Sequence, residues 1–240
     1  MDHPDESKQL DRIRFQMRIQ GKAPEQLPPL LSGIHTRGYL PHVKREGAWY
    51  FVTFRLADSL PTSVLAKLEF ELENSRHEVG GESRGLTASE RKKARQRMIE
   101  RYLDQGAGAC WLQRPEVAQM AVEALKHFNG IRYELDEWVI MPNHIHLVLL
   151  PLANHSLSSI LHSRKRLIAR EANKLIGKTG ESFWQPESYD HWIRSDEEMA
   201  RIKEYVRQNP VKGRLCESAD EWPWGSACRN AGKGDQETID

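Results

Sequence analysis

The chain has 240 residues and a net charge of +1; 39% of its residues are hydrophobic and 29% are charged. This composition is typical of a folded globular protein and excludes a disordered or membrane-embedded one. No apolar run approaches the roughly 20 residues of a membrane helix, and the charged N-terminus has no apolar signal core. We therefore expect a cytoplasmic protein without a membrane partner.

The three cysteines, Cys110, Cys216 and Cys228, are widely spaced and form no CxxC pair. This spacing argues against a disulfide framework and against a zinc knuckle. A net charge near zero does not exclude nucleic acid, because affinity for phosphates depends on where the positive charge is concentrated.

The chain is expected to form one domain over residues 41–228, with a basic helical insertion at about 80–112. The first residues alternate charge with Pro and Gly, which predicts a partly ordered lead-in over 1–40. A flexible tail is expected over 229–240. No internal repeat is visible.

The first clear element is WYFVTFRLA (49–57), whose aromatic and β-branched residues alternate as in a strand. The segment 87–106 begins with Thr87 and has Glu90 three residues later, a capping box that predicts a helix. That helix is strongly basic. Its charged side is either a solvated face or a face that follows a DNA backbone.

Apolar residues at helical spacing predict a helix over 114–130, and alternation predicts a strand over 131–140. A Met-Pro-Asn turn follows, and HIHLVLL (144–150) runs back as a second strand. So short a connection joins only antiparallel neighbours. Further elements are then expected in this order: a helix over 156–177, a strand over 189–194, and a helix over 196–209 that Pro210 closes.

This order of elements describes an α+β domain with an antiparallel sheet and helices grouped on one face. A ferredoxin-like arrangement is the obvious example.

Two histidines open the second strand of the hairpin. His144 and His146 point to the same side, while the alternate residues Ile145 and Leu147 point to the other. We expect the apolar side to meet the helices and the histidine side to stay open. The imidazoles can converge on one cation, or they are surface or hydrogen-bonded structural residues.

A second pair of polar residues stands in EYVRQNPVKGRL (204–215). Tyr205 and Asn209 are four residues apart and share a helix face. The amide can act as a third metal ligand and the phenol as a nucleophile. The alternative is an interfacial aromatic residue and a C-cap. Because Asn209 precedes proline, it is expected to be the last helical residue at most.

Taken together, MPNHIHL and YVRQNPVKGRL resemble the motifs of the single-tyrosine HUH transposases. The segments YFVTFRLADSLP, FWQPESYD and WPWGSA are similar to the REP-associated tyrosine transposases, and the resemblance covers roughly residues 40 to 227. One departure is local. The family usually reads Ala-Gly after the basic residue that follows NPV, where this chain has Gly213-Arg214.

The resemblance implies the HUH endonuclease fold and a metal-dependent single-stranded DNA endonuclease and strand transferase. A divalent cation, Mg²⁺ or Mn²⁺, would be held by His144, His146 and Asn209. Tyr205 would attack phosphorus, release a 3′-hydroxyl and form a 5′-phosphotyrosine that a second 3′-hydroxyl can reverse. No general base for Tyr205 can be identified from the sequence.

The expected partner is single-stranded or hairpin DNA, bound by a monomer or a homodimer. Basic side chains would contact phosphates, and aromatic ones would stack on bases or pack in the core. The candidate DNA-binding residues are Arg91, Lys92, Arg95, Arg164, Lys165, Arg166, Trp184, Gln185, Tyr189 and His191.

Two other functions were weighed. A non-catalytic nucleic-acid-binding regulator that keeps the fold stays open as the alternative. A histidine-triad nucleotide hydrolase fails, because Val148 stands where the third alternate histidine would be.

Overall fold

The computed structural model describes residues 33–37, 40–44, 47–61, 63–64, 66–67, 70–71, 76–79, 82–85 and 87–228. Apart from a few residues, the expected lead-in lies outside the described residues, and the expected C-terminal tail lies wholly outside them. No helix among the described residues is long and apolar enough to cross a membrane.

A four-stranded antiparallel sheet forms the centre of the fold. Its strands are β3 (Tyr50–Arg55), β6 (Tyr133–Met141), β7 (His144–Pro151) and β8 (Tyr189–Trp192), in the spatial order β6-β7-β3-β8. Strand, helix, hairpin, helix and strand follow one another along the chain, as in a ferredoxin-like fold. The predicted α+β class and the antiparallel hairpin are therefore confirmed.

One face of the sheet is covered by α4 (Pro115–Lys126) and α5 (Leu157–Leu175). Proline at the first turn suits the start of α4, because its missing N–H would have had no helical partner there. Ser156 caps α5 as its sequence predicts, accepting a hydrogen bond from the backbone N–H of Ser159.

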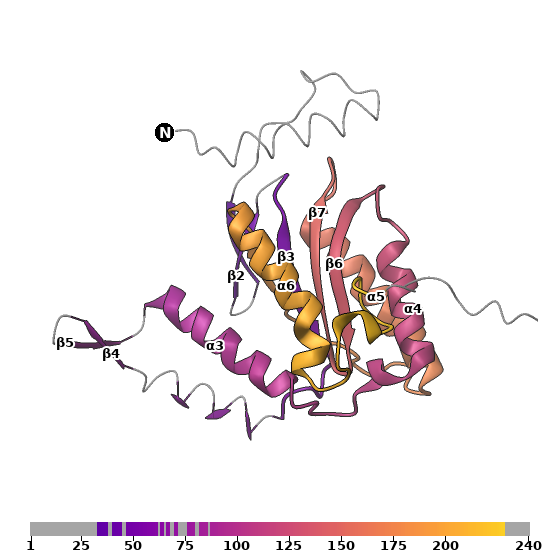
Figure 1. Cartoon of the computed structure of the whole chain (residues 1–240), viewed down its shortest axis with the longest axis horizontal. Coiled ribbons are helices and arrows are strands. Elements are labelled where there is room, and N and C mark those ends of the chain that lie inside the picture. Colours follow the sequence, from indigo (N-terminus) through magenta and orange to yellow (C-terminus); the bar gives the residue numbers. More distant parts are fainter. Residues whose placement is uncertain are drawn as a thin grey trace, which may run out of the picture.

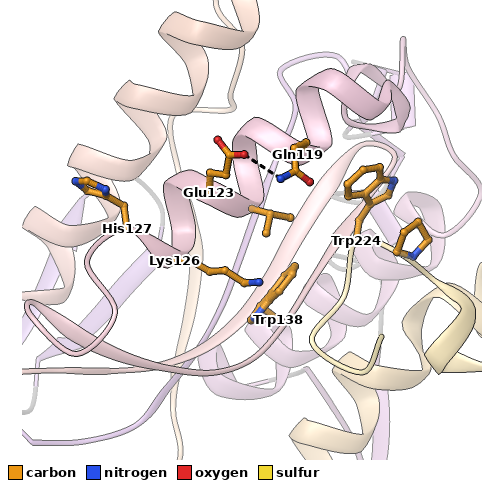
Figure 2. Close-up of a pocket in the computed structure, with 8 residues that line it drawn as sticks. Gln119, Glu123, Lys126, His127, Trp138 and Trp224 are labelled. Atoms are coloured by element: carbon orange, nitrogen blue, oxygen red, sulfur yellow. Dashed lines mark hydrogen bonds between the residues drawn. The ribbon is translucent and has the colours of Figure 1, made fainter. Parts of the chain in front are cut away.

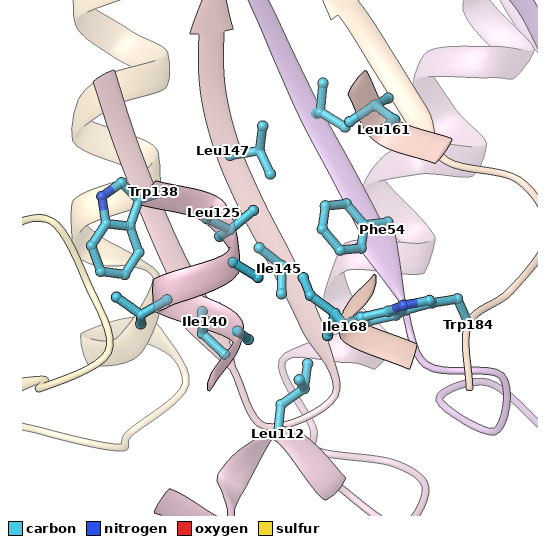
Figure 3. Close-up of a cluster of buried hydrophobic side chains, with 14 of the residues drawn as sticks. Phe54, Leu112, Leu125, Trp138, Ile140, Ile145, Leu147, Leu161, Ile168 and Trp184 are labelled. Atoms are coloured by element: carbon cyan, nitrogen blue, oxygen red, sulfur yellow. The ribbon is translucent and has the colours of Figure 1, made fainter. Parts of the chain in front are cut away.

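The main hydrophobic core fills the space between this face and the two helices. Ile145 and Leu147 of β7 and Phe54 of β3 are at most 1% exposed, and they meet Leu125 of α4 and Ile168 of α5 (Figure 3). Alternation in HIHLVLL thus places its apolar side where the sequence predicts.

The opposite face of the sheet is covered by α6 (Asp196–Lys212), which lies across the sheet in Figure 1. Val206 of α6 is fully buried in a second core cluster with Val139 and Val148. The expectation that all helices share one face and leave the histidine side open is therefore wrong. The apolar residues interleaved with the histidines give α6 a surface on which to pack.

Helix α6 does not end at Asn209. It continues through Pro210 to Lys212, and the N–H of Gly213 donates to the Asn209 carbonyl at 2.9 Å. Pro210 removes one hydrogen bond from the helix, but the following turn still closes. The prediction that Pro210 closes the helix is thus wrong by one turn.

The chain departs from the family pattern at the residue pair after that turn, Gly213 and Arg214. A Cβ on Gly213 would lie 3.1 Å from Met141 Cε, so a larger residue would crowd the sheet. Arg214 adopts a positive φ of 57°, a conformation that favours glycine.

The segment between β3 and α4 contains more than the predicted helix. A hairpin of β4 (Arg76–Val79) and β5 (Glu82–Gly85) precedes α3 (Ala88–Leu103). The capping box of Thr87 and Glu90 is confirmed. The remaining described elements are β1 (Gly33–Arg37), β2 (Leu40–Lys44), and the 3₁₀ turns η2 (Trp111–Gln113) and η3 (Ala219–Glu221).

Removing core volume beneath the histidine strand should destabilise the fold. We predict that Leu147→Ala lowers the free energy of unfolding by about 2–5 kcal/mol in urea denaturation, because the cavity adds to the lost apolar burial. Leu175→Ala, at an exposed position on α5, should change it by less than about 0.5 kcal/mol. Equal losses in the two variants would contradict this assignment of the core.

Candidate active site

The two histidines of β7 meet beneath α6. His144 and His146 are both 0% exposed, and their Nε2 atoms lie 3.0 Å apart. The outer nitrogen of each ring is held by a neighbour: His144 Nδ1 lies 2.7 Å from Asn143 Oδ1, and His146 Nδ1 lies 2.8 Å from Thr53 Oγ1. The antiparallel register places Thr53 opposite His146. Both inner nitrogens therefore face one point.

Asn143 fixes the tautomer of His144. Its amide Nδ2 donates to the carbonyls of Leu103 and Ala107 at 3.3 and 2.9 Å, so its oxygen is turned toward the ring. That oxygen accepts the Nδ1–H of His144, which leaves a lone pair on Nε2. The Nε2 atoms of His144 and His146, 3.0 Å apart, must share a proton or a cation. Two metal–nitrogen bonds of about 2.0–2.1 Å that meet at a right angle would give this separation.

Burial keeps both imidazoles neutral. Desolvation lowers the pKa of His144 to about 3, against a smaller opposing effect from the Asn209 side chain. Desolvation, with a smaller contribution from His144, also lowers the pKa of His146 well below its ordinary value. Neutral imidazole is the form that binds metal ions.

Helix α6 brings Tyr205 and Asn209 to the same point. The Tyr205 hydroxyl lies 3.5 Å from His146 Nε2. Asn209 is 0% exposed, and its amide lies against His144 and Tyr205, yet neither its oxygen nor its nitrogen has a hydrogen-bond partner of normal geometry. A buried amide without a partner is costly.

The donor set fits a divalent cation. Within the described residues no group of three or more His, Cys, Asp or Glu side chains could hold a metal ion, so a third protein ligand beside the two histidines would be of another residue type. The orphaned Asn209 amide beside His144 and His146 supplies one. Nitrogen and oxygen donors of this kind suit Mn²⁺ and tolerate Mg²⁺.

The surroundings of Tyr205 hold its hydroxyl protonated. Burial, and next the Glu100 charge, raise its pKa far above the ordinary value. Phe51 packs edge-on against the ring, and the Lys212 ammonium lies 4.8 Å from its centroid. An attack by this phenol therefore needs a group that removes its proton.

Two acidic residues near Tyr205 were missed from the sequence. Glu100 of α3 and Asp104, the C-cap residue of that helix, both raise the pKa of Tyr205, and burial raises the pKa of both carboxyls. Their spacing of four residues was a signal that they share a helix face. The sequence does not indicate that this face of the helix is turned toward α6.

The predicted basic residues are divided between surface and interior. Arg91 and Arg166 are exposed, and the side chain of Lys92 lies outside the described residues. Arg164 is only 6% exposed, and its guanidinium donates to the Ala124 carbonyl at 2.9 Å. These contacts give Arg164 a structural role.

Three cations gather near the end of β3. Burial and, to a smaller extent, the charge of the nearby Arg95 lower the pKa of Arg55 to about 10. Burial and, to a smaller extent, the charge of Arg55 lower the pKa of Lys165 to about 8. Arg55 shares the histidine side of the sheet, because alternate residues of β3 point the same way and Thr53 bonds His146.

The predicted aromatic residues lie mainly inside the fold. Trp184 is 6% exposed, and its indole N–H donates to the Lys165 carbonyl at 3.0 Å. Tyr189 packs edge-on against Phe51 beside the site, and His191 is paired with Glu198 at 2.8 Å. Gln185 donates from its side chain to the carbonyl of Ala57.

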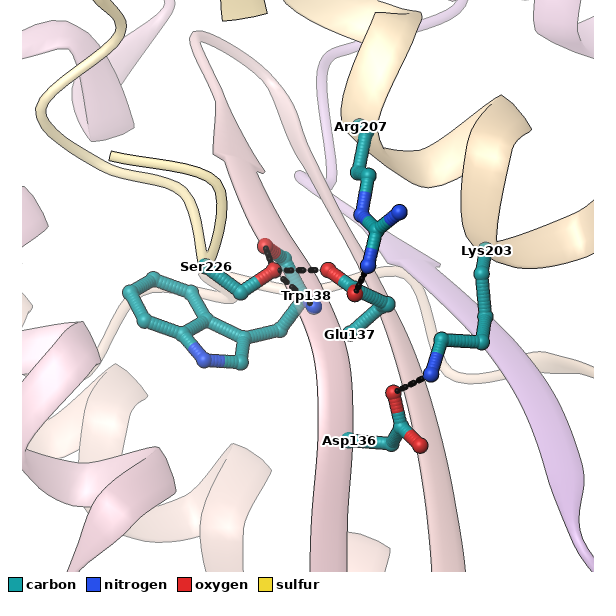
Figure 4. Close-up of polar contacts among 6 residues, drawn as sticks. All are labelled: Asp136, Glu137, Trp138, Lys203, Arg207 and Ser226. Carbon is teal, nitrogen blue, oxygen red and sulfur yellow. Dashed lines mark hydrogen bonds and ion pairs between the residues drawn. The ribbon is translucent and has the colours of Figure 1, made fainter. Parts of the chain in front are cut away.

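Polar contacts fix α6 on the sheet (Figure 4). A register shift between Leu135 and Trp138 breaks the regular alternation of β6 at Asp136 and Glu137. Lys203 pairs with Asp136 at 2.7 Å, and Arg207 pairs with Glu137 one turn later.

Glu137 also accepts a hydrogen bond from Ser226. The turn that carries Tyr205 lies between Lys203 and Arg207, so the two pairs fix its rotation about the helix axis.

A surface cavity of about 440 Å³ lies elsewhere (Figure 2). It adjoins α4 and β6 on the side of the sheet away from the histidines, and none of the predicted site residues lines it. Its lining consists of Gln119, Val122, Glu123, Lys126, His127, Trp138, Pro223 and Trp224.

The family model described as "Transposase IS200 like" matches residues 113–209, a segment that includes both histidines, Tyr205 and Asn209. Over this segment the chain is similar to the IS200-like transposases. The match confirms the resemblance carried by the motifs.

Two curated relatives are similar to part of the chain. The REP-associated tyrosine transposase of Escherichia coli K12 is 28% identical over 103 residues, which cover 42% of this chain and 59% of the relative. A putative REP-associated tyrosine transposase of Haemophilus influenzae is 32% identical over 100 residues, covering 38% and 57%. The chain thus spans less than three fifths of the length of either relative.

Two solved structures are similar to the chain at low sequence identity. A REP-associated tyrosine transposase bound to a REP hairpin is 18% identical, with a TM-score of 0.45, over 83% of this chain and 86% of that one. A putative transposase from Deinococcus radiodurans is 15% identical, with a TM-score of 0.29, over 73% and 96%.

Removing the Arg207 guanidinium should loosen α6. We predict that Arg207→Ala lowers the free energy of unfolding by about 1–3 kcal/mol, because the nearly buried Glu137 loses its charged partner. Arg201→Ala, at an exposed position on the same helix, is the control and should change it by less than about 0.5 kcal/mol. Urea denaturation measures both, and a loss in Arg207→Ala no larger than in the control would refute the anchoring role.

Proposed function

We propose that the protein is a metal-dependent endonuclease and strand transferase for single-stranded or hairpin DNA, with Tyr205 as its nucleophile. The observation that carries this proposal is the meeting of the Tyr205 hydroxyl, two neutral imidazoles and an unpartnered amide at one buried point. The family match over the same residues supports it.

His144, His146 and Asn209 would hold the divalent cation, Mg²⁺ or Mn²⁺. When bound there, the cation would polarise the scissile phosphate and neutralise the charge that develops on it. Thr53 and Asn143 orient the two rings, a supporting role that outer partners commonly have at metal sites.

Tyr205 would form the covalent link to DNA. Its hydroxyl oxygen attacks phosphorus, the bond to the 3′-oxygen breaks, and a 5′-phosphotyrosine remains. Because the link keeps the energy of the phosphodiester, a second 3′-hydroxyl can attack it and rejoin strands. The ion pairs of Lys203 and Arg207 keep the tyrosine on the histidine side throughout.

The DNA backbone would approach along the cluster of Arg55, Arg95 and Lys165. Like charges held close together favour a bound anion, and phosphates supply one. The exposed side chains of Arg91 and Arg166 extend the positive charge. Hairpin-forming repeats are the proposed substrate, in keeping with the names of the curated relatives.

We further propose a single catalytic domain over 41–228 that acts in the cytoplasm as a monomer or a homodimer. A non-catalytic DNA-binding regulator is the alternative. The unsatisfied Asn209 amide favours the enzyme, because a mere binding module gains nothing from a buried polar group without a partner.

Loss of the phenol should abolish covalent capture of DNA. We predict that Tyr205→Phe gives no adduct with a labelled hairpin carrying a single-stranded flank in the presence of Mn²⁺, while Tyr102→Phe on α3 gives as much adduct as the wild type. A denaturing gel measures the adduct. An adduct that persists in Tyr205→Phe would show that another residue is the nucleophile.

Loss of one imidazole should weaken metal binding. We predict that His144→Ala lowers Mn²⁺ affinity at least about tenfold in calorimetric titration. His127→Ala, which removes an exposed histidine at the distant cavity, should leave the affinity unchanged. Equal affinity in the two variants would remove His144 from the ligand set.

A further inference from the structure

The surface cavity beside α4 has one wall built from the segment after η3. This wall contains Pro223 and Trp224 and lies along the outer edge of β6, the edge strand of the sheet. The N–H of Ile140 donates to the Trp224 carbonyl at 2.8 Å, and the N–H of Ser226 donates to the Trp138 carbonyl at 2.9 Å. These backbone bonds fix the wall, so the cavity of about 440 Å³ is formed before any ligand arrives.

The cavity offers aromatic surface with positive charge beside it. Trp138 and Trp224 both line it, and the Trp224 side chain is only half-buried. The Lys126 ammonium, on the last residue of α4, lies 5.3 Å from the centroid of the Trp138 ring (Figure 2). Arg132, whose guanidinium stacks on Phe128 at 3.8 Å, places a second cation in the turn after α4. A flat ring that carries a phosphate suits such a surface.

Two polar side chains of α4 line the same cavity. Gln119 and Glu123 stand one turn apart, and Gln119 Nε2 donates to Glu123 Oε1 at 2.9 Å (Figure 2). This bond leaves the Gln119 carbonyl oxygen and the second Glu123 oxygen as acceptors. Acceptors favour a base with an exocyclic amino group: cytosine offers amino hydrogens where thymine offers a carbonyl oxygen.

The wall of the cavity is tied to the helix that carries Tyr205. Ser226 donates from its hydroxyl to Glu137, and Arg207 of α6 pairs with the other oxygen of the same carboxylate (Figure 4). Trp138, which lines the cavity, follows Glu137 directly on β6. A ligand in the cavity therefore lies at a fixed position relative to the nucleophile, on the opposite face of the sheet.

We propose that this cavity binds one base of the single-stranded flank of the DNA, an inference that rests on the proposed function for its partner. The base stacks on Trp224, its amino group donates to Glu123, and its phosphate meets the Lys126 ammonium. Because the wall is joined to α6, the bound base helps to set which phosphate reaches Tyr205. Trp224 lies outside residues 113–209, so the family match does not assign this cavity.

Binding of a labelled hairpin, with or without a single-stranded cytosine flank, tests the stacking contact. Fluorescence anisotropy measures the affinity of the full chain without added metal. Trp224→Ala should weaken binding of the flanked hairpin about 5- to 100-fold and leave binding of the hairpin without a flank unchanged. Trp224→Phe keeps a ring on which a base can stack, so its affinity should stay within about threefold of the wild type.

Base identity gives a second measurement, at exposed positions whose substitution spares the core. We expect the wild type to bind a cytosine flank at least about fivefold more tightly than a thymine flank. Glu123→Gln should lower this ratio below about twofold, because the carboxylate acceptor is lost. Glu116→Gln is the matched control: it changes an exposed glutamate of the same helix outside the cavity and should keep the wild-type ratio.

The outcomes separate this inference from the proposed function. Equal affinity of the wild type and Trp224→Ala for the flanked hairpin would assign the cavity to a ligand other than DNA and overturn the inference alone. An unchanged base preference in Glu123→Gln would also overturn it, even if Trp224→Ala fails to fold. A wild type that binds the flank through Trp224 but forms no covalent adduct would overturn the proposed nuclease and leave the base site standing. A wild type that binds neither hairpin would overturn both.

Discussion

The rest of the site depends on the burial of two neutral imidazoles with their inner nitrogens 3.0 Å apart. Burial removes their charge, and hydrogen-bond contacts with Thr53 and Asn143 hold their outer nitrogens, so the orientation of both rings is settled before any substrate arrives. A buried polar group is tolerated only when it is paired. The pair therefore defines a place for a shared proton or a cation.

Each layer of the fold contributes one part of this site. The ferredoxin-like core on the far face provides most of the buried apolar area. Helix α6 closes the near face and brings Tyr205 and Asn209, with its rotation fixed by ion pairs to β6. The charges of Glu100 on α3 and of Asp104 at its C-cap raise the pKa of Tyr205.

Sequence patterns predicted what depends on local periodicity. Alternation put His144 on the opposite side from the core, and the capping box gave the start of α3. Contacts between distant elements could not be predicted. Alternation indicates which side of the sheet a residue faces, but it does not indicate that α6 covers that side. The amphipathic pattern of α5 likewise does not indicate that Arg164 points inward. The effect of Glu100 on the pKa of Tyr205 was missed for the same reason, because it depends on how α3 and α6 lie relative to each other.

The central claim is that Tyr205 becomes covalently linked to DNA beside the histidine pair. Mass spectrometry of the DNA-linked peptide after tryptic digestion tests it most directly. The account predicts a nucleotide joined through its 5′-phosphate to Tyr205 within the peptide Glu204 to Arg207. A link to any other residue, or cleaved DNA with a free 5′-phosphate and no linked peptide, would contradict it.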